Sequence, residues 1–158
     1  MPTNSLPADP AHRYFEDYPV GAVFDLGTFC FSEAEIIEFA TRYDPQAMHI
    51  DREWAARGPL GGVIASGWHT IAGMMRLVAD NFLPGNGLPS PGIDEVRWLL
   101  PVRPGDTLSV RATVTDARRS RSRPDRGLMT SHVEVLNASG SPVLTMKPMN
   151  FIRCRPAG

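Results

Sequence analysis

The stretch "SGWHTIAGMMRLVADNF", Ser66 to Phe82, decides the fold of this chain. It predicts a helix from about Gly67 to Phe82, with Ser66 as the N-cap residue. Few positions of this helix are polar, and its apolar side chains are Trp68, Ile71, Met74, Met75, Leu77, Val78 and Phe82. Because a helix that is apolar on most sides is a buried one, we expect a single long helix inside the domain.

Four β-strands are predicted after this helix, over residues 93–100, 106–117, 127–137 and 141–154. Pro148 lies inside the last of them and indicates a bulge or an edge position. Before the helix, the sequence predicts a strand over 22–31 and a helix that begins at a capping box, Ser32 with Glu35, and ends at Tyr43. Strands that follow helices indicate an α+β domain, and we expect its antiparallel sheet to curl around the long helix.

The chain has 158 residues, 42% of them hydrophobic and 21% charged, which is typical of one globular domain. We divide it into a flexible N-terminal arm, residues 1–13, and a single domain, residues 14–158.

The net charge of −1 gives no general attraction to nucleic acid or to a membrane surface. The sequence contains neither an apolar run of membrane-spanning length nor a signal peptide, so we expect a cytoplasmic protein. Cys30 and Cys154 lack metal-binding spacing, and we expect reduced thiols.

The segment "YDPQAMHID", Tyr43 to Asp51, carries the first candidate for chemistry. Pro45 ends the preceding helix at Asp44, and His49 lies five positions after Asp44. A folded loop can bring a carboxylate and an imidazole to one water molecule, and such a pair can move protons near neutral pH. The spacing by itself favours the alternative, in which Asp44 caps a turn and His49 lies on the surface.

Gly67 is the second candidate. It opens the long helix, whose first N–H groups have no partner within the helix and lie at the positive end of its dipole. Such donors can bind a carbonyl oxygen that becomes negative during a reaction. On local grounds alone, a glycine that permits a tight turn is the simpler interpretation. Together, a helix start with free N–H groups and an acid–base pair on the preceding loop suit chemistry beside a carbonyl group.

Three segments, "YDPQAMHID", "GGVIASGWHT" and "PVRPGDTL", together resemble the MaoC-like dehydratases, a family that includes the (R)-specific enoyl-CoA hydratases. The resemblance covers residues 14–155 and implies a hotdog fold, an antiparallel sheet wrapped around one long helix. It implies an enzyme that reversibly hydrates a trans-2-enoyl thioester to the (R)-3-hydroxyacyl thioester. The implied substrate is an acyl-CoA or acyl-carrier-protein thioester, bound in a tunnel between the subunits of a homodimer or a dimer-based oligomer. Coenzyme A belongs to the substrate, and no metal or redox cofactor is implied.

The resemblance also implies roles for individual residues. Asp44 and His49 match the catalytic pair that activates water, and Gly67 matches the glycine whose N–H binds the thioester oxygen. Ser66 stands where many members have histidine, and Gln46 stands where the commonest motif has asparagine. The candidate substrate-binding residues are Gln46, Ser66, Trp68 and Arg97.

Other interpretations stay open. A thioesterase on the same fold would direct water at C1, and a non-catalytic hotdog protein would bind acyl-CoA without turnover. A metal site at Asp44, His49 and Asp51 lacks a second histidine at ligand spacing, and Asp51 is predicted to be the N-cap of a short helix, "DREWAAR". The five arginines within residues 118–126 could bind the phosphates of coenzyme A, although a solvated hairpin loop is the simpler interpretation.

Overall fold

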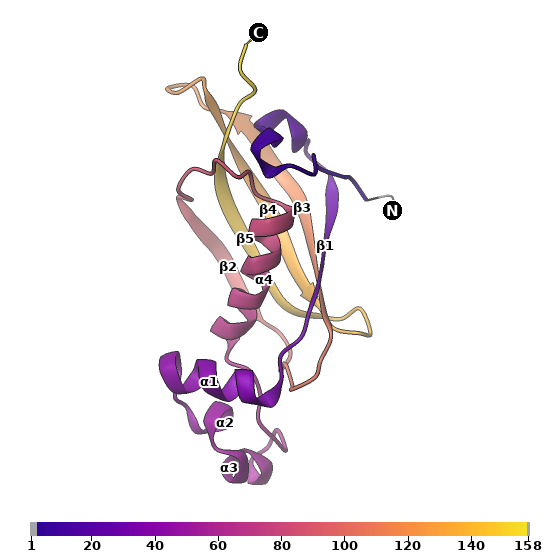
Figure 1. The fold of residues 1–158 in the computed structure, drawn as a ribbon, viewed down its shortest axis with the longest axis vertical. Helices are drawn as coiled ribbons and strands as arrows, with labels where there is room; N and C mark the ends of the chain where they lie inside the picture. Colours follow the sequence, from indigo (N-terminus) through magenta and orange to yellow (C-terminus); the bar gives the residue numbers. More distant parts are fainter. Residues whose placement is uncertain (1–2, 158) are drawn as a thin grey trace.

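The computed structural model describes residues 3–157, and its elements follow the predicted order (Figure 1). Two short 3₁₀ helices, η1 (Pro10–His12) and η2 (Phe15–Asp17), precede strand β1 (Val23–Phe29). The helices are α1 (Glu33–Tyr43), α2 (Ala47–Ile50), α3 (Arg52–Arg57) and the long α4 (Gly67–Asn81). The remaining strands are β2 (Gly92–Trp98), β3 (Leu108–Arg119), β4 (Arg126–Leu136) and β5 (Pro142–Arg153).

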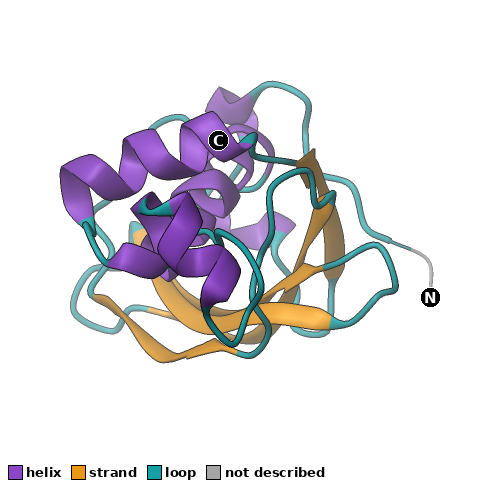
Figure 2. Cartoon of the chain, turned by 90° about the horizontal axis from the view of Figure 1, so that it is seen from below, coloured by secondary structure: helices purple, strands orange, loops and turns teal. Residues whose placement is uncertain are grey.

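The five strands form one antiparallel sheet in the order β1-β3-β4-β5-β2, so β1 and β2 are its edges. Helix α4 lies along one face of this sheet (Figure 1). In the view from below, the sheet curves beneath the helices (Figure 2). A curved antiparallel sheet wrapped around one long helix is the hotdog fold, and the predicted fold class is therefore confirmed.

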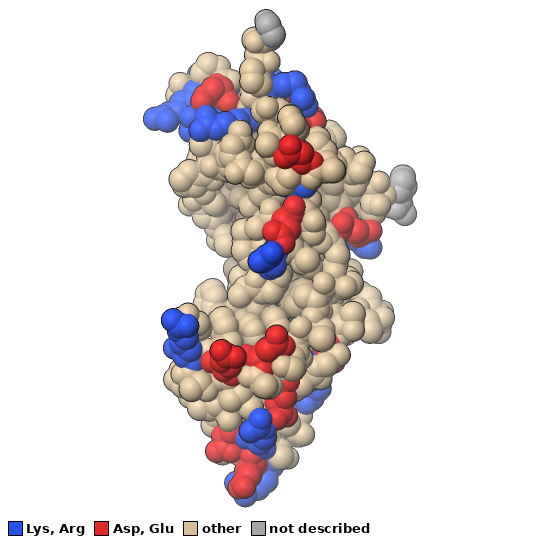
Figure 3. Space-filling view, viewed as in Figure 1, with Lys and Arg blue, Asp and Glu red and all other residues tan. Residues whose placement is uncertain are grey.

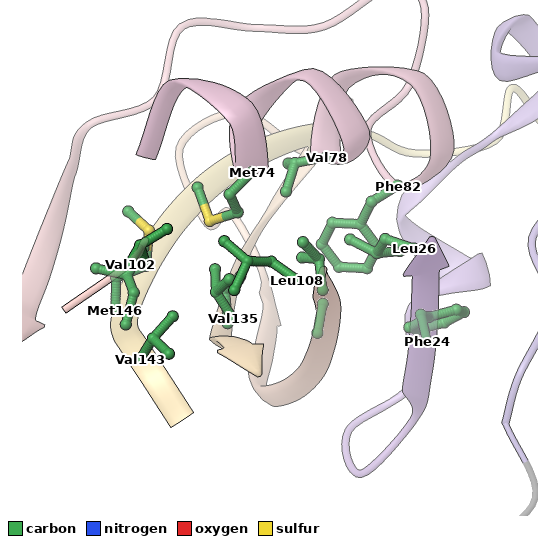
Figure 4. Packing of buried hydrophobic residues seen from close by; sticks show 14 of the residues in the cluster. Phe24, Leu26, Met74, Val78, Phe82, Val102, Leu108, Val135, Val143 and Met146 are labelled. Carbon is green, nitrogen blue, oxygen red and sulfur yellow. The ribbon is translucent and has the colours of Figure 1, made fainter. Parts of the chain in front are cut away.

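The hydrophobic core lies between α4 and the sheet (Figure 4). The helix contributes Met74, Val78 and the following residue Phe82, all at most 6% exposed. The facing strand positions alternate buried and accessible side chains along β3 and β4, as period-2 patterning requires. Because this packing fixes α4 along its length, it also fixes the position of the helix N-terminus, where the candidate site lies.

The prediction that α4 is buried on most sides is wrong for the single chain. Trp68 is 59% exposed and Met75 is 43% exposed, although both are large apolar side chains. The reason is geometric, since the sheet covers only one face of the helix. The opposite face is left uncovered within the part of the chain that the structure describes.

The predicted helix boundaries before α4 are confirmed by their caps. Ser32 and Glu35 form the reciprocal capping box at the start of α1, and the Asp51 carboxylate accepts a hydrogen bond from the Trp54 N–H at the start of α3. The one-turn helix α2 was not predicted. It begins at Ala47, after the N-cap residue Gln46, and four residues are too few for hydrophobic periodicity to reveal them.

Pro148 occupies a different position from the predicted sheet edge. Strand β5 lies between β4 and β2, so the edge interpretation is wrong. Between the Thr130–Met149 pair and the Val133–Met146 pair, no β4–β5 pairing is formed. A proline lacks the N–H that would continue the ladder. The residue is therefore accommodated in a central strand at the cost of a local gap in the pairing.

The N-terminal segment was predicted to be a flexible arm, and residues 1 and 2 of it lie outside the described residues. Its last residue, Arg13, is 5% exposed. The Arg13 guanidinium donates hydrogen bonds to the backbone carbonyls of Asp80 and Leu83, at the end of α4. The segment also meets the domain earlier, because the Asn4 N–H donates to the Val23 carbonyl and the Gly85 N–H donates to the Pro10 carbonyl. The flexibility of the segment stays a prediction.

Both cysteines are free thiols, with Cys30 exposed and Cys154 buried. Within residues 3–157, no helix has both the length and the apolar character that a membrane span requires.

Candidate active site

A cavity of about 460 Å³ lies at the N-terminal end of α4, next to α1 and α2. The loop and helix side of this cavity is formed by Asp44, Gln46, Met48, His49, Leu60, Ile64 and Ala65. The start of α4 contributes Gly67, Trp68 and Thr70, and the opposite wall is formed by Trp98, Leu99, Leu100, Pro101 and Val102. Polar groups from α1 and α2 therefore face an otherwise apolar cavity.

Asp44 is the C-cap residue of α1, because Pro45 prevents the helix from continuing. Its carboxylate accepts one hydrogen bond from the Ser66 hydroxyl and one from the Gln46 side-chain amide, each 2.7 Å long. These two bonds, the one from Ser66 foremost, hold the pKa of Asp44 below its usual value. Asp44 is therefore an ionised carboxylate at neutral pH, with a lone pair free on each oxygen.

His49 is 5% exposed and lies on the one-turn helix α2. Its Nδ1 lies 2.7 Å from the backbone carbonyl oxygen of Ile64, which is hydrogen-bond distance. Because a carbonyl oxygen can only accept, Nδ1 must carry the proton of this bond. In the neutral ring this bond leaves the lone pair on Nε2, which lies 3.5 Å from the Asp44 carboxylate. That separation is long for a direct hydrogen bond and suits a water molecule bound to both atoms.

The first turn of α4 has one free donor. The Trp68 N–H bonds to the Ser66 hydroxyl, and the N–H groups of the next two residues bond to the Ser66 carbonyl. Within residues 3–157, the Gly67 N–H has no acceptor. A Cβ atom at position 67 would overlap the indole ring of Trp98. The close approach of Trp98 therefore favours glycine here, whereas the turn does not require it, because Gly67 has no positive φ.

The structure brings most of the predicted site residues together. Asp44, Gln46, His49, Gly67 and Trp68 all line the cavity. Ser66 is fully buried behind them and connects Asp44 to the start of α4, because its hydroxyl donates to the carboxylate and accepts from the helix.

Arg97 is the exception among the predicted site residues. It does not line the cavity, and its guanidinium donates to the backbone carbonyl of Val96. The adjacent residue Trp98 lines the cavity instead and packs edge-to-face against Trp68, with ring centroids 5.3 Å apart. Side chains alternate along β2, so the neighbour of an outward-facing arginine faces the site.

Residues 99–102 were not predicted to belong to the site, yet they form much of its wall. The only signal for them in the sequence is the apolar segment "WLLPV" at the end of a strand. Such a segment is equally typical of a core strand, and its pairing with the loop before α4 arises from the fold: the Ala65 N–H donates to the Val102 carbonyl at 2.8 Å.

Two alternative sites were considered from the sequence, a metal site and a phosphate-binding arginine segment. No group of three His, Cys, Asp or Glu side chains within residues 3–157 could hold a metal ion. The arginine-rich segment 118–126 forms the β3–β4 hairpin at the opposite end of the sheet from α1–α3 (Figure 1). Basic side chains gather at that end of the molecule, far from the cavity (Figure 3).

Comparison with known proteins agrees with this fold. The model of the MaoC-like domain family matches residues 17–137, and the chain therefore belongs to this family. The crystal structure of a MaoC-like dehydratase from Rhodospirillum rubrum superposes with a TM-score of 0.85 at 39% identity, over 92% of this chain and 99% of that one.

Two relatives by sequence are similar over most of their length. A 3-hydroxybutyryl-CoA dehydratase from Methylorubrum extorquens is 33% identical over 70% of this chain and 69% of that protein. The uncharacterised protein YdeM from Bacillus subtilis is 29% identical over 77% of this chain and 86% of that protein. The chain is thus a hotdog protein of a family that includes hydratases and dehydratases.

Proposed function

We propose that this protein hydrates trans-2-enoyl thioesters to (R)-3-hydroxyacyl thioesters and catalyses the reverse dehydration. The observation that carries the proposal is the shared cavity, which is lined by Asp44, by His49 and by Gly67, whose N–H has no acceptor within residues 3–157. The similarity to a MaoC-like dehydratase and to a 3-hydroxybutyryl-CoA dehydratase supports the same reaction class. The thioester would belong to coenzyme A or to an acyl carrier protein.

In the proposed mechanism, one water molecule is bound by the Asp44 carboxylate and by His49 Nε2. These groups accept a proton as the water oxygen forms its bond to C3 of the enoyl group. The π electrons of the C2–C3 double bond move toward the thioester oxygen, which accepts a hydrogen bond from the Gly67 N–H. The proton held by the pair then passes to C2, so that the elements of one water molecule have added to the double bond.

The surrounding hydrogen bonds suit these roles. Ser66 and Gln46 keep Asp44 ionised, and a carboxylate accepts a proton only in that form. The Ile64 carbonyl fixes the His49 tautomer whose Nε2 can act as a base. The dipole of α4 adds partial positive charge at the Gly67 N–H, where the negative oxygen would lie.

The test is an assay of the enoyl thioester absorbance with crotonyl-CoA, with thiol release measured in parallel. The wild-type protein is expected to remove the absorbance without releasing thiol. Asp44→Asn should lower kcat/KM by roughly 10²–10⁴-fold, the usual contribution of a general acid–base group. Asp51→Asn is the matched control, because asparagine also caps a helix and Asp51 lies outside the cavity.

The other outcomes separate the rival functions. Thiol release would indicate a thioesterase. Binding of acyl-CoA without any turnover would indicate a binding protein. Near-normal hydration by Asp44→Asn would contradict the proposed role of the carboxylate.

We also propose that a second copy of the chain covers the uncovered face of α4 and the edge strand β2. Large apolar side chains gather there in an exposed state; they are Trp68, Met75, Ile93, Trp98, Leu99 and Leu100. Several of them also line the cavity, so a partner subunit would complete its wall. Light scattering is expected to give a dimer, and Ile93→Glu is expected to give a monomer with lower activity. A monomeric wild-type protein at micromolar concentration would contradict the proposal.

A further inference from the structure

The sheet-side wall of the cavity carries a single polar side-chain group. This wall is formed by Trp98, Leu99, Leu100, Pro101 and Val102. Only the tryptophan among them has a side-chain hydrogen-bond donor, the indole Nε1–H, which cannot act as an acceptor. Within residues 3–157 this N–H donates to no acceptor. An apolar wall therefore presents one free donor to the site.

The indole ring of Trp98 lies directly against Gly67. A Cβ atom built on Gly67 would be 2.2 Å from Nε1, 2.5 Å from Cε2 and 2.6 Å from Cδ1 of this ring. Because both carbon distances are only slightly longer than the nitrogen distance, the Cβ position lies above the ring plane, over Nε1. A point along the N–H bond would be much farther from both carbons. The N–H bond lies in the ring plane, so it runs past Gly67 and is not blocked by it.

The backbone N–H of Gly67 and the indole N–H are close enough to share one oxygen atom. In standard covalent geometry, a Cβ atom lies about 2.5 Å from the backbone nitrogen of its own residue. With 2.2 Å from that Cβ position to Nε1, the two nitrogen atoms are at most about 4.7 Å apart. Two N–H···O bonds of about 2.9 Å to one oxygen can join nitrogen atoms up to about 5.8 Å apart. The separation therefore permits one oxygen to accept from both groups.

The indole is held in this position by two elements of the fold. Trp98 is the last residue of β2, and it pairs with Leu144 of β5 in the sheet. Its ring packs edge-to-face against Trp68 in the first turn of α4, with centroids 5.3 Å apart and an angle of 72° between the planes. A donor that is already in place when charge develops needs no reorganisation during the reaction, which is the property that stabilises a transition state.

We propose that Trp98 is a catalytic residue, whose Nε1–H joins the Gly67 N–H in binding the thioester oxygen. As the water oxygen bonds to C3, the π electrons of the C2–C3 double bond move toward this oxygen, and both hydrogen bonds strengthen as its negative charge grows. Neither N–H gives up its proton. This inference rests on the proposed hydratase function, because it takes the Gly67 N–H as the group that meets the thioester.

The test is the substitution Trp98→Phe, which removes the N–H and keeps an aromatic ring in the wall. With crotonyl-CoA, kcat is expected to fall by roughly 10²–10³-fold, the usual loss for one oxyanion donor. KM is expected to change little, because an interaction made mainly in the transition state lowers kcat and kcat/KM together. Circular dichroism verifies that the variant is folded.

Trp54→Phe on α3 is the matched control. Trp54 is 48% exposed and Trp98 is 47% exposed, and Trp54 lies outside the cavity. This variant should keep the wild-type kcat. An unchanged kcat in Trp98→Phe would overturn the inference. A loss that appears only as a higher KM would also overturn it, because Trp98 would then only pack against the substrate. An equal fall of kcat in Trp54→Phe would overturn it as well.

A spectroscopic measurement separates this inference from the proposed function. Butyryl-CoA labelled with carbon-13 at the thioester carbonyl has no double bond to hydrate, and its carbonyl stretch moves to lower frequency as the oxygen accepts hydrogen bonds. Infrared difference spectra are expected to show a lower frequency in the complex with the wild type than in the complex with Trp98→Phe. The same frequency in both complexes, or no binding of butyryl-CoA, would overturn the inference. If this difference is found but crotonyl-CoA is not hydrated, the proposed function fails and the two-donor site stands.

Discussion

His49 and His69 lie on either side of the α4 N-terminus and are buried to nearly the same degree, with 5% and 8% of their surface exposed. Their surroundings are opposite. His49 contacts the Ile64 carbonyl and the Asp44 carboxylate. His69 is stacked between the rings of Phe31 and Phe39, with centroid distances of 3.7 and 4.4 Å, and its Nδ1 has no partner within the described residues.

Burial alone therefore does not make a histidine reactive. Polar partners fix the tautomer of His49 and aim its free nitrogen at a carboxylate. Stacking on two phenyl rings makes His69 part of the packing between α1 and α4, and burial lowers its pKa. Burial therefore favours the neutral ring at position 69.

The largest expected effect comes from replacing each histidine in turn. His49→Ala should lower the hydration rate by roughly 10²–10⁴-fold, because it removes a proposed acid–base group. His69→Phe should keep kcat/KM close to wild type, because a phenyl ring preserves the stack. Steady-state kinetics with crotonyl-CoA, with circular dichroism to verify folding, measures both. Equal losses of kcat/KM in the two variants would contradict the assignment of a catalytic role to His49 and a packing role to His69.

A smaller effect is expected from replacing Ser66, whose hydroxyl connects Asp44 to the start of α4. Ser66→Ala removes an N-cap, at a cost of about 1 kcal/mol, and one of the two hydrogen bonds to Asp44. Because that bond lowers the pKa of Asp44, its loss should raise this pKa and move the acidic limb of the rate profile to higher pH.

Ser32→Ala is the matched control, because it removes the N-cap of α1 and touches no site residue. Both variants should lose similar stability, and only Ser66→Ala should shift the profile of kcat/KM against pH. A shift of the same size in Ser32→Ala would show that it results from lost stability.

The smallest expected effect concerns the pH dependence of stability. A histidine whose pKa is lower in the folded protein binds fewer protons than it does in the unfolded chain. Stability from neutral His69 is therefore complete above the ordinary histidine pKa of about 6.5 and declines as the pH falls toward its lower folded value. The charged groups around it are Glu35, Glu38 and Arg42.

His69→Phe should remove this part of the decline. The thermal midpoint of the wild type should fall further than that of the variant over this pH interval. Differential scanning calorimetry at several pH values measures the difference. Parallel pH curves for the two proteins would mean that His69 does not titrate in this range.

Much of the fold could be predicted from local patterns. The capping box at Ser32, the cap at Asp51 and the start of α4 at Ser66 each depend on residues within one helical turn, and all three are confirmed. Pro148 shows the limit, because a proline reveals that a ladder bond is missing but not which strand lies beside it.

For the candidate site, the chemical groups can be identified in the sequence, whereas the packing of distant segments determines which of them lie together. Asp44, His49 and Gly67 stand out in the sequence because a turn, a spacing and a helix start are local features. That the Ser66 hydroxyl reaches Asp44 across 22 residues and that Trp98 and not Arg97 faces the cavity depend on how distant segments pack. The physical reason is that dihedral preferences and caps act over a few residues, whereas a cavity is enclosed by side chains from elements far apart in the chain.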